Sequence, residues 1–305
     1  MPLTCRRLLL LLAFTPCALA QEPFHLSVRT NEVSITFNAE DQSGHPLTDL
    51  TAADVRLFDN NLAPDRVTLF LRHKDLPLRI AILFDESGSM DGALRPSTIA
   101  RGLAASTIQT SADQALIIRF DFASKLQQDW TSDPKILATA ASHVADDNKS
   151  RCCGTALWDT LYLACRDHLS PQTPGAETSS NAIILFTDGL DNRSHALPQD
   201  VVEECQRKQT AIYPFVAPDR AHFDSGQKAL RSIAELTGGR VFYQQSTSEA
   251  ITASALQISQ DLRNQYTLVY RPAKFKRNGA FHHIKLESPT RTAVFNARTG
   301  YYASH

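Results

Sequence analysis

Several oxygen-bearing side chains follow an apolar segment near the start of this sequence. The apolar run over 78–84 is typical of a buried strand in a parallel sheet. Asp85, Ser87 and Ser89 come directly after it, and Gly88 allows the backbone to turn between them. These side chains would lie on the loop that leaves the carboxyl end of the strand, where open α/β sheets bind ligands. Hard oxygen ligands of this kind suit a divalent cation such as Mg²⁺.

Two later segments carry further oxygen ligands. Gly154-Thr155 precedes a predicted helix and adds a hydroxyl from a loop. A second apolar run over 183–186 leads into Thr187, Asp188 and a turn glycine. The pattern places Asp188 at the carboxyl end of another strand, adjacent to the first at the point where strand order reverses.

The three segments together resemble the metal-ion-dependent adhesion site of von Willebrand factor A-type (VWFA) domains, in which D-x-S-x-S, a Gly-Thr loop and T-D-G occur in this order. The five matching positions are Asp85, Ser87, Ser89, Thr155 and Asp188. The resemblance implies that the three hydroxyls bind Mg²⁺ or Mn²⁺ directly, while the two carboxylates act partly through water. It also implies that an Asp or Glu carboxylate of a partner protein completes the shell. A hydroxyl-rich, six-coordinate site favours these ions over the larger Ca²⁺.

We therefore expect an exported protein-binding module of the adhesion type. The alternative is a structural subunit of an envelope assembly, in which the metal only rigidifies loops. Serine and aspartate in such loops also serve as turn formers and helix caps, and we interpret Asp159 and Asp191 as helix-surface and loop charges.

An enzyme is not expected. Ser89 lacks the G-x-S-x-G context of a nucleophile elbow, and His195 is the one histidine expected among the loops around the site. The sequence contains neither a P-loop nor G-x-G-x-x-G, which disfavours nucleotide binding.

The hydrophobic pattern divides the chain into four parts: a signal peptide (1–20), a β segment (21–76), an α/β part (77–264) that the resemblance implies is the VWFA domain, and a second β segment (265–305). Strands alternate with helices only in the third part. The predicted fold is α/β, with a doubly wound, mostly parallel six-stranded sheet and a small β-sandwich that the two β segments form together. In the last segment a single strand is expected from Val294 to Tyr302. This order of parts also resembles a group of secreted bacterial VWFA-related proteins.

The first residues and the net charge bear on where the protein acts. Arg6-Arg7, the apolar run over 8–14 and Ala18-Leu19-Ala20 are typical of a signal peptide cleaved near Ala20. No later segment is predicted to span a membrane. We expect a secreted, periplasmic or cell-surface protein. A net charge of -1 provides no field to attract nucleic acid.

Four cysteines would remain after cleavage: Cys152, Cys153, Cys165 and Cys205. An oxidising compartment allows three pairings of four cysteines. A Cys165–Cys205 bond is conceivable because both helices should cover the same sheet face, and two buried free thiols are an equal alternative. A bond between the adjacent Cys152 and Cys153 would be strained.

Overall fold

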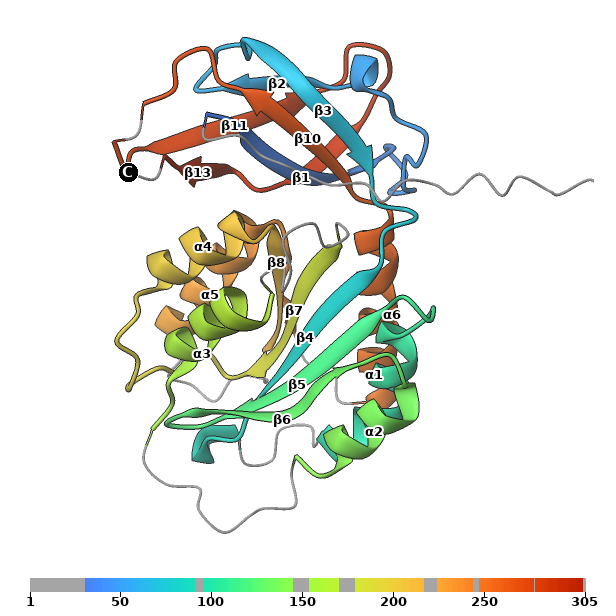
Figure 1. The fold of residues 1–305 in the computed structure, drawn as a ribbon, viewed down its shortest axis with the longest axis vertical. Coiled ribbons are helices and arrows are strands. Elements are labelled where there is room, and N and C mark those ends of the chain that lie inside the picture. The colour runs from blue at the N-terminus through green and yellow to red at the C-terminus, as the bar shows by residue number, and fades with distance from the viewer. Residues whose placement is uncertain are drawn as a thin grey trace, which may run out of the picture.

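A computed structural model describes residues 31–90, 96–144, 154–169, 179–216, 224–243, 247–276 and 278–303. The predicted signal peptide and the pair Cys152-Cys153 lie outside these residues. The chain forms an α/β domain with a smaller all-β part packed on one end of it (Figure 1). None of the described helices is long and apolar enough to cross a membrane.

A six-stranded sheet forms the centre of the α/β domain. Its spatial order is β6 (Ser124–Thr131), β5 (Gln114–Phe120), β4 (Leu78–Asp85), β7 (Ser180–Thr187), β8 (Thr210–Val216) and β9 (Phe242–Tyr243). Every neighbouring pair is parallel except β5 and the edge strand β6. This is the doubly wound order, which reverses between its first and fourth strands in sequence, here β4 and β7. The predicted fold class is confirmed.

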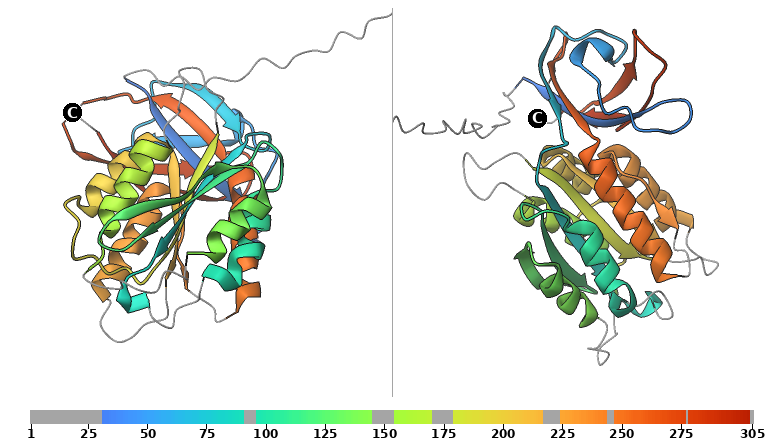
Figure 2. Two further views of the ribbon diagram at one scale, coloured as in Figure 1. Left: turned by 60° about the horizontal axis from the view of Figure 1, so that its bottom comes forward. Right: turned by 90° about the vertical axis from the view of Figure 1, so that its right-hand side faces the viewer.

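Helices cover both faces of this sheet (Figures 1 and 2). One face packs against α1 (Pro96–Thr107), α2 (Pro134–Ser142) and α6 (Ser248–Arg263). The other face packs against α3 (Leu157–Leu163), α4 (Pro198–Arg207) and α5 (Asp224–Thr237). The α3 helix continues into the π turn η3 (Ala164–His168), and a disulfide joins Cys165 of this turn to Cys205 of α4, with their Cα atoms 5.2 Å apart. Of the two alternatives for these thiols, the structure contains the bond.

Two antiparallel sheets form the second part, and each combines strands from both ends of the chain. The first has the order β12 (Val294–Ala297), β1 (Val33–Glu40), β10 (Tyr266–Arg271) and β3 (Arg66–Arg72). The second has the order β13 (Gly300–Tyr302), β11 (Phe281–Glu287) and β2 (Arg56–Asp59), with the short turn η1 (Ala52–Asp54) before β2. Their inner faces share one core that includes Phe37, Leu57 and Tyr266. The sandwich predicted from the two terminal segments is confirmed.

The predicted strand from Val294 to Tyr302 was wrong in one respect. It divides into β12, which pairs with β1, and β13, which pairs with β11 in the other sheet. The chain crosses between sheets at Arg298-Thr299, and Gly300 then passes so close to β11 that a Cβ there would lie 2.2 Å from the His282 carbonyl oxygen. Alternation of apolar residues does not reveal a change of sheet, because both sheets bury the same kind of side chain.

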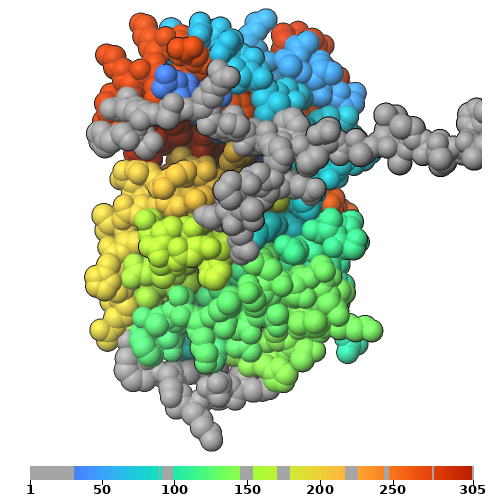
Figure 3. Space-filling view, viewed as in Figure 1, coloured from blue at the N-terminus to red at the C-terminus, as the bar shows by residue number. Residues whose placement is uncertain are grey.

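The sandwich sits beside the amino ends of β4 and β7, and two chain connections join it to the α/β domain (Figure 1). Hydrogen bonds cross the seam between them. The Asn38 side chain donates to the Asp261 carbonyl at 2.6 Å, and the Gln206 side chain donates to the Gly300 carbonyl at 3.2 Å. Figure 3 shows the C-terminal strands, coloured red, directly above the yellow residues of α4 along this seam. The carboxyl ends of the central strands therefore lie at the far end of the molecule from the sandwich.

Candidate metal site

Two carboxylates occupy the carboxyl ends of the central strands. Asp85 is the last residue of β4, and Asp188 directly follows β7. The two strands pair in parallel, with Phe84 opposite Phe186, so both acids leave the sheet at the same edge. Below them the rings of Phe84, Phe186, Phe215 and Phe242 stack across four strands with centroids 4.9 Å apart. Both carboxylates are buried, at 7% and 5% exposed.

Hydrogen bonds fix the orientation of the Asp85 carboxylate. Its Oδ1 accepts from the Ser87 backbone N–H at 2.9 Å, and its Oδ2 accepts from the Thr187 hydroxyl at 2.7 Å. Burial and, to a smaller degree, the negative charge of Asp188 raise the pKa of Asp85 to about 6 against these hydrogen bonds.

Asp188 has one oxygen that is satisfied and one that is not. Its Oδ1 accepts from the Leu190 backbone N–H at 2.9 Å. Its Oδ2 is shut off from solvent and accepts no hydrogen bond from the described residues. A buried carboxylate oxygen without a partner costs free energy and calls for a missing ion or water.

The two predicted hydroxyl ligands that can be located are both buried at this edge. Ser87 is 6% exposed and begins the turn into η2 (Gly88–Met90), where its carbonyl accepts from the Met90 N–H at 3.0 Å. Thr155 is 3% exposed. The backbone of Ser89 lies in η2, and its side chain is outside the described part of the chain. The assignment of Ser87, Ser89 and Thr155 as metal ligands stays a prediction.

The loop that carries Thr155 is bound tightly to the loop after β7. The Thr155 N–H donates to the Asn192 side chain at 2.9 Å, and its carbonyl accepts from the Asn192 and Arg193 backbone N–H groups at 3.1 Å each. Gly154 precedes it with φ of +116°, a conformation that L side chains rarely adopt. A Cβ at this position would lie 2.4 Å from the Asn192 Oδ1.

Asp191 and Asp159 hold the same loops together, a role that the sequence analysis missed. Asp191 Oδ1 accepts from the Leu157 N–H at the start of α3 at 2.9 Å and from the Ser194 hydroxyl at 2.5 Å. Asp159 Oδ1 accepts from the backbone N–H groups of His195 at 3.0 Å and Ala196 at 2.7 Å. The spacing of Asp191 and Ser194 indicates a local turn, but the bonds to α3 exist only because the two loops meet in space.

The donor set at this edge fits a hard cation. It offers carboxylate and hydroxyl oxygens, one carboxylate oxygen has no partner, and the two acids repel each other without a cation between them. Across the described ranges, no group of three or more His, Cys, Asp or Glu side chains could hold a metal. A site built on Asp85 and Asp188 therefore needs hydroxyl ligands, as the predicted set provides.

A serine–histidine pair does not occur among the described contacts at this edge. The His195 side chain is 96% exposed, and its ring lies 3.3 Å from the Asp159 carboxylate. A hydrogen bond between Ser180 and His73, at 2.6 Å, lies at the opposite end of the sheet and is buried. Nothing in these contacts points to a hydroxyl nucleophile with its base.

No protein-family model matches this chain, and no curated protein matches its sequence significantly. Solved structures with a similar fold include BatB from Bacteroides thetaiotaomicron, at 18% identity and a TM-score of 0.47 over 60% of this chain and 98% of that one. Proximal thread matrix protein 1 from the mussel byssus, with a zinc-occupied MIDAS motif, matches at 18% identity and a TM-score of 0.47 over 68% of this chain and 50% of that one. Human Sec24c matches at 11% identity and a TM-score of 0.45, covering 76% and 44%.

Identities and TM-scores this low carry no argument about what the chain binds. The strand order and the position of the three motif segments carry the conclusion about the fold. The D-x-S-x-S, Gly-Thr and T-D-G segments all meet at the carboxyl edge of a doubly wound sheet, beside the point where strand order reverses. The α/β domain of this chain has a VWFA-like fold.

Proposed function

We propose that this chain is a metal-dependent protein-binding module. A divalent cation, Mg²⁺ or Mn²⁺, would be held by Asp85, Ser87, Ser89, Thr155 and Asp188 and would bridge to an Asp or Glu carboxylate of a partner. The observation that carries the proposal is the buried Oδ2 of Asp188, which has no partner in the described structure, close to a second buried acid.

The residue types favour a ligand that is itself an acid. Serine and threonine hydroxyls are neutral ligands, so an ion that they bind keeps much of its positive charge. Mg²⁺ takes six oxygens in an octahedron and keeps positions for water or for an incoming carboxylate. In this chain, Thr187 and the Ser87 N–H orient the Asp85 carboxylate for this role.

The loop contacts favour a ligand-binding role over a purely structural one. The Thr155 loop is already fixed by Asn192, Asp191 and Asp159 through hydrogen bonds that need no metal. A cation that only rigidified these loops would add little to them. The scaffold alternative remains the second candidate, and the two differ in what removal of the metal changes.

We also propose that the protein acts outside the cytoplasm. The predicted signal peptide and the disulfide between Cys165 and Cys205 support this proposal, because disulfides persist in oxidising compartments. The carboxyl edge of the sheet lies at the end of the α/β domain away from the sandwich (Figure 1).

Calorimetric titration of Mg²⁺ and Mn²⁺ into the mature protein tests the metal site. We expect saturable binding to one site, lost in the double variant Asp85→Asn/Asp188→Asn. The matched control is Asp121→Asn, because Asp121 lies on the neighbouring loop after β5 and, among the described residues, its carboxylate accepts a local N–H from Ala123 at 3.2 Å and no other. The control should bind as the wild-type protein does.

Removal of the metal by a chelator then distinguishes the binding proposal from the scaffold alternative. In the binding proposal, excess EDTA abolishes capture of an acidic protein ligand by the folded protein, and the melting temperature falls as well because the ion binds only the folded state. In the scaffold alternative, EDTA lowers the melting temperature and leaves the affinity of the folded fraction intact. An affinity that is unchanged in EDTA would reject the binding proposal.

A further inference from the structure

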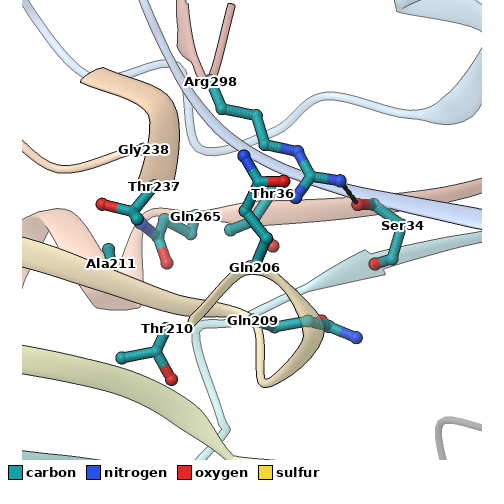
Figure 4. Close-up of a pocket in the computed structure, with 10 residues that line it drawn as sticks. All are labelled: Ser34, Thr36, Gln206, Gln209, Thr210, Ala211, Thr237, Gly238, Gln265 and Arg298. Atoms are coloured by element: carbon teal, nitrogen blue, oxygen red, sulfur yellow. Dashed lines mark hydrogen bonds between the residues drawn. The ribbon is translucent and has the colours of Figure 1, made fainter. Parts of the chain in front are cut away.

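A small cavity lies in the seam between the sandwich and the α/β domain. Its volume is about 20 Å³. Four residues of the sandwich side and six of the α/β domain line it (Figure 4): Ser34, Thr36, Gln265 and Arg298, and Gln206, Gln209, Thr210, Ala211, Thr237 and Gly238. The cavity is therefore polar, and both parts of the molecule form it.

Two of the lining residues have buried polar groups without partners in the described structure. The Arg298 Nε and the Ser34 hydroxyl are shut off from solvent and make no hydrogen bond. Gln265, only 5% exposed, lines the same cavity with its side-chain amide (Figure 4). All three groups can donate, so the cavity offers donors to something that accepts.

Arg298 also lacks a counter-charge. Its Nη2 donates to the Ser34 carbonyl at 2.7 Å, and its guanidinium lies 5.8 Å from the centre of the Tyr301 ring. Figure 4 shows the guanidinium between Ser34 and Gln206. No carboxylate of the described residues forms an ion pair with it, and none of the ten lining residues is acidic.

The Asp59 carboxylate, inside the sandwich, already has hydrogen-bond partners of its own. Asp59 accepts from Tyr270 and Tyr301, each at 2.8 Å, and lies 2.7 Å from His282. Burial lowers the pKa of Arg298 to about 10, which still leaves the guanidinium charged at neutral pH. Arg298 is partly exposed, but its Nε is shut off from solvent. A charged group with a buried donor and no counter-charge is costly unless something offsets that cost.

We propose that the seam cavity binds a small monovalent inorganic anion of the size of chloride, held by Arg298, Ser34 and Gln265. A water molecule needs about 10–15 Å³ and would satisfy the donors, but it would leave the charge of Arg298 uncompensated. An anion accepts from these donors and offsets the charge of Arg298. Because it lies in a cavity that residues of both parts line, it also stabilises the docking of the sandwich on the α/β domain. This site is separate from the candidate metal site, at the other end of the sheet.

Thermal unfolding in two sodium salts at equal ionic strength tests the proposal, with EDTA present to remove divalent cations. Gluconate is too large for the cavity, so only chloride can bind there. We expect the melting temperature to rise by roughly 3 °C as chloride replaces gluconate, since a ligand that binds only the folded state stabilises it. Crystals grown with bromide should show an anomalous peak within hydrogen-bonding distance of Arg298.

Variants identify the residues responsible. Arg298→Gln and Gln265→Leu should each remove the difference between chloride and gluconate, and Gln265→Leu keeps the volume of the side chain and the charge of Arg298. The control is Arg291→Gln, because Arg291 is a sandwich arginine with a surface partner, Asp49, at 2.9 Å. Equal melting temperatures of the wild-type protein in both salts, with no bromide peak, would overturn the proposal in favour of a water-filled cavity.

Discussion

Two residues at the carboxyl edge of the sheet carry buried charges that are costly to the metal-free protein. Asp85 and Asp188 are both buried, and the Asp188 Oδ2 has no partner among the described residues. Two buried acids with an unsatisfied oxygen destabilise a metal-free protein. Stability and metal binding should therefore respond in opposite directions when one of these charges is removed.

Asp188→Asn should show this opposition. In EDTA the variant should be more stable than the wild-type protein, by about 1–3 kcal/mol, because the substitution removes a buried charge that has an unsatisfied oxygen. With saturating Mg²⁺ the order should reverse, since only the wild-type protein gains from the ion. Urea unfolding under both conditions measures the two differences. A variant that is less stable than the wild-type protein in EDTA would contradict the argument.

Metal affinity should depend on pH through Asp85. Its pKa is raised to about 6, so the carboxyl binds a proton in competition with the cation below that pH. We expect Mg²⁺ affinity to fall roughly tenfold between pH 7 and pH 5 and to level off above pH 7. Equal dissociation constants at pH 5 and pH 7, measured by calorimetry, would show that Asp85 does not take part.

The same raised pKa gives a stability effect of known sign in the metal-free protein. The folded state holds the Asp85 proton more tightly than the unfolded state, whose pKa is near 3.8. The resulting stabilisation is complete below about pH 3.8 and is lost as the pH rises through 6. Metal-free protein should therefore lose stability from this group over that interval.

At the scale of elements, single acids join segments that local patterns leave unconnected. Asp113, just before β5, is the clearest case. Its carboxylate accepts from the backbone N–H groups of Leu78, Gln109 and Thr110 at 2.8–3.0 Å, and it pairs with Arg263 of α6 at 2.6 Å. Burial raises the pKa of Asp113, but these hydrogen bonds and the Arg263 charge outweigh burial and hold it below its usual value. One side chain thus joins β4, β5 and the end of α6.

Asp113→Ala should destabilise the protein by about 3–5 kcal/mol, because it leaves a partly buried arginine and three backbone donors without a partner. The control is Asp133→Ala, which removes an exposed N-cap of α2 whose carboxylate accepts from the Lys135 N–H at 2.8 Å. The control substitution should lower the free energy of unfolding by about 1 kcal/mol. Chemical denaturation of both variants measures the difference, and similar values for the two would contradict this account.

At the scale of the whole molecule, the seam decides how the two parts hold together. His73 lies at its centre, 95% buried on the connection from β3 to β4. Its ring nitrogens lie 2.6 Å from the Ser180 hydroxyl of β7 and 2.7 Å from the Thr267 hydroxyl of β10. Burial lowers the pKa of His73 from 6.5 to about 4, so the folded protein holds the neutral ring.

Stability should therefore fall in acid through His73. The unfolded chain takes up the proton near pH 6.5 and the folded chain only near pH 4, so the contribution is present above 6.5 and is lost as the pH falls to about 4. The full loss is about 3 kcal/mol, at about 1.4 kcal/mol per pKa unit. His73→Gln should be less stable at pH 7 and should show a shallower decline between pH 6.5 and 4. Parallel profiles of stability against pH for the wild-type protein and the variant would rule out this contribution of His73.

The sequence by itself determined the central sheet, its flanking helices and the end of the sheet where the candidate site lies. Apolar runs bounded by Asp85 and Thr187 identify the two central strands. These features depend on local periodicity, which a single segment carries within itself.

Only the tertiary structure decided the contacts between segments. The unsatisfied oxygen of Asp188, the bonds from Asp191 and Asp159 to residues 34 to 37 positions away, the separation of β12 from β13, and the cavity around Arg298 all depend on which surfaces meet after packing. The local sequence around a polar side chain is the same whether or not that side chain finds a hydrogen-bond partner in a distant segment. Hydrogen bonds between distant segments form only where the packed backbone brings donor and acceptor within about 3 Å.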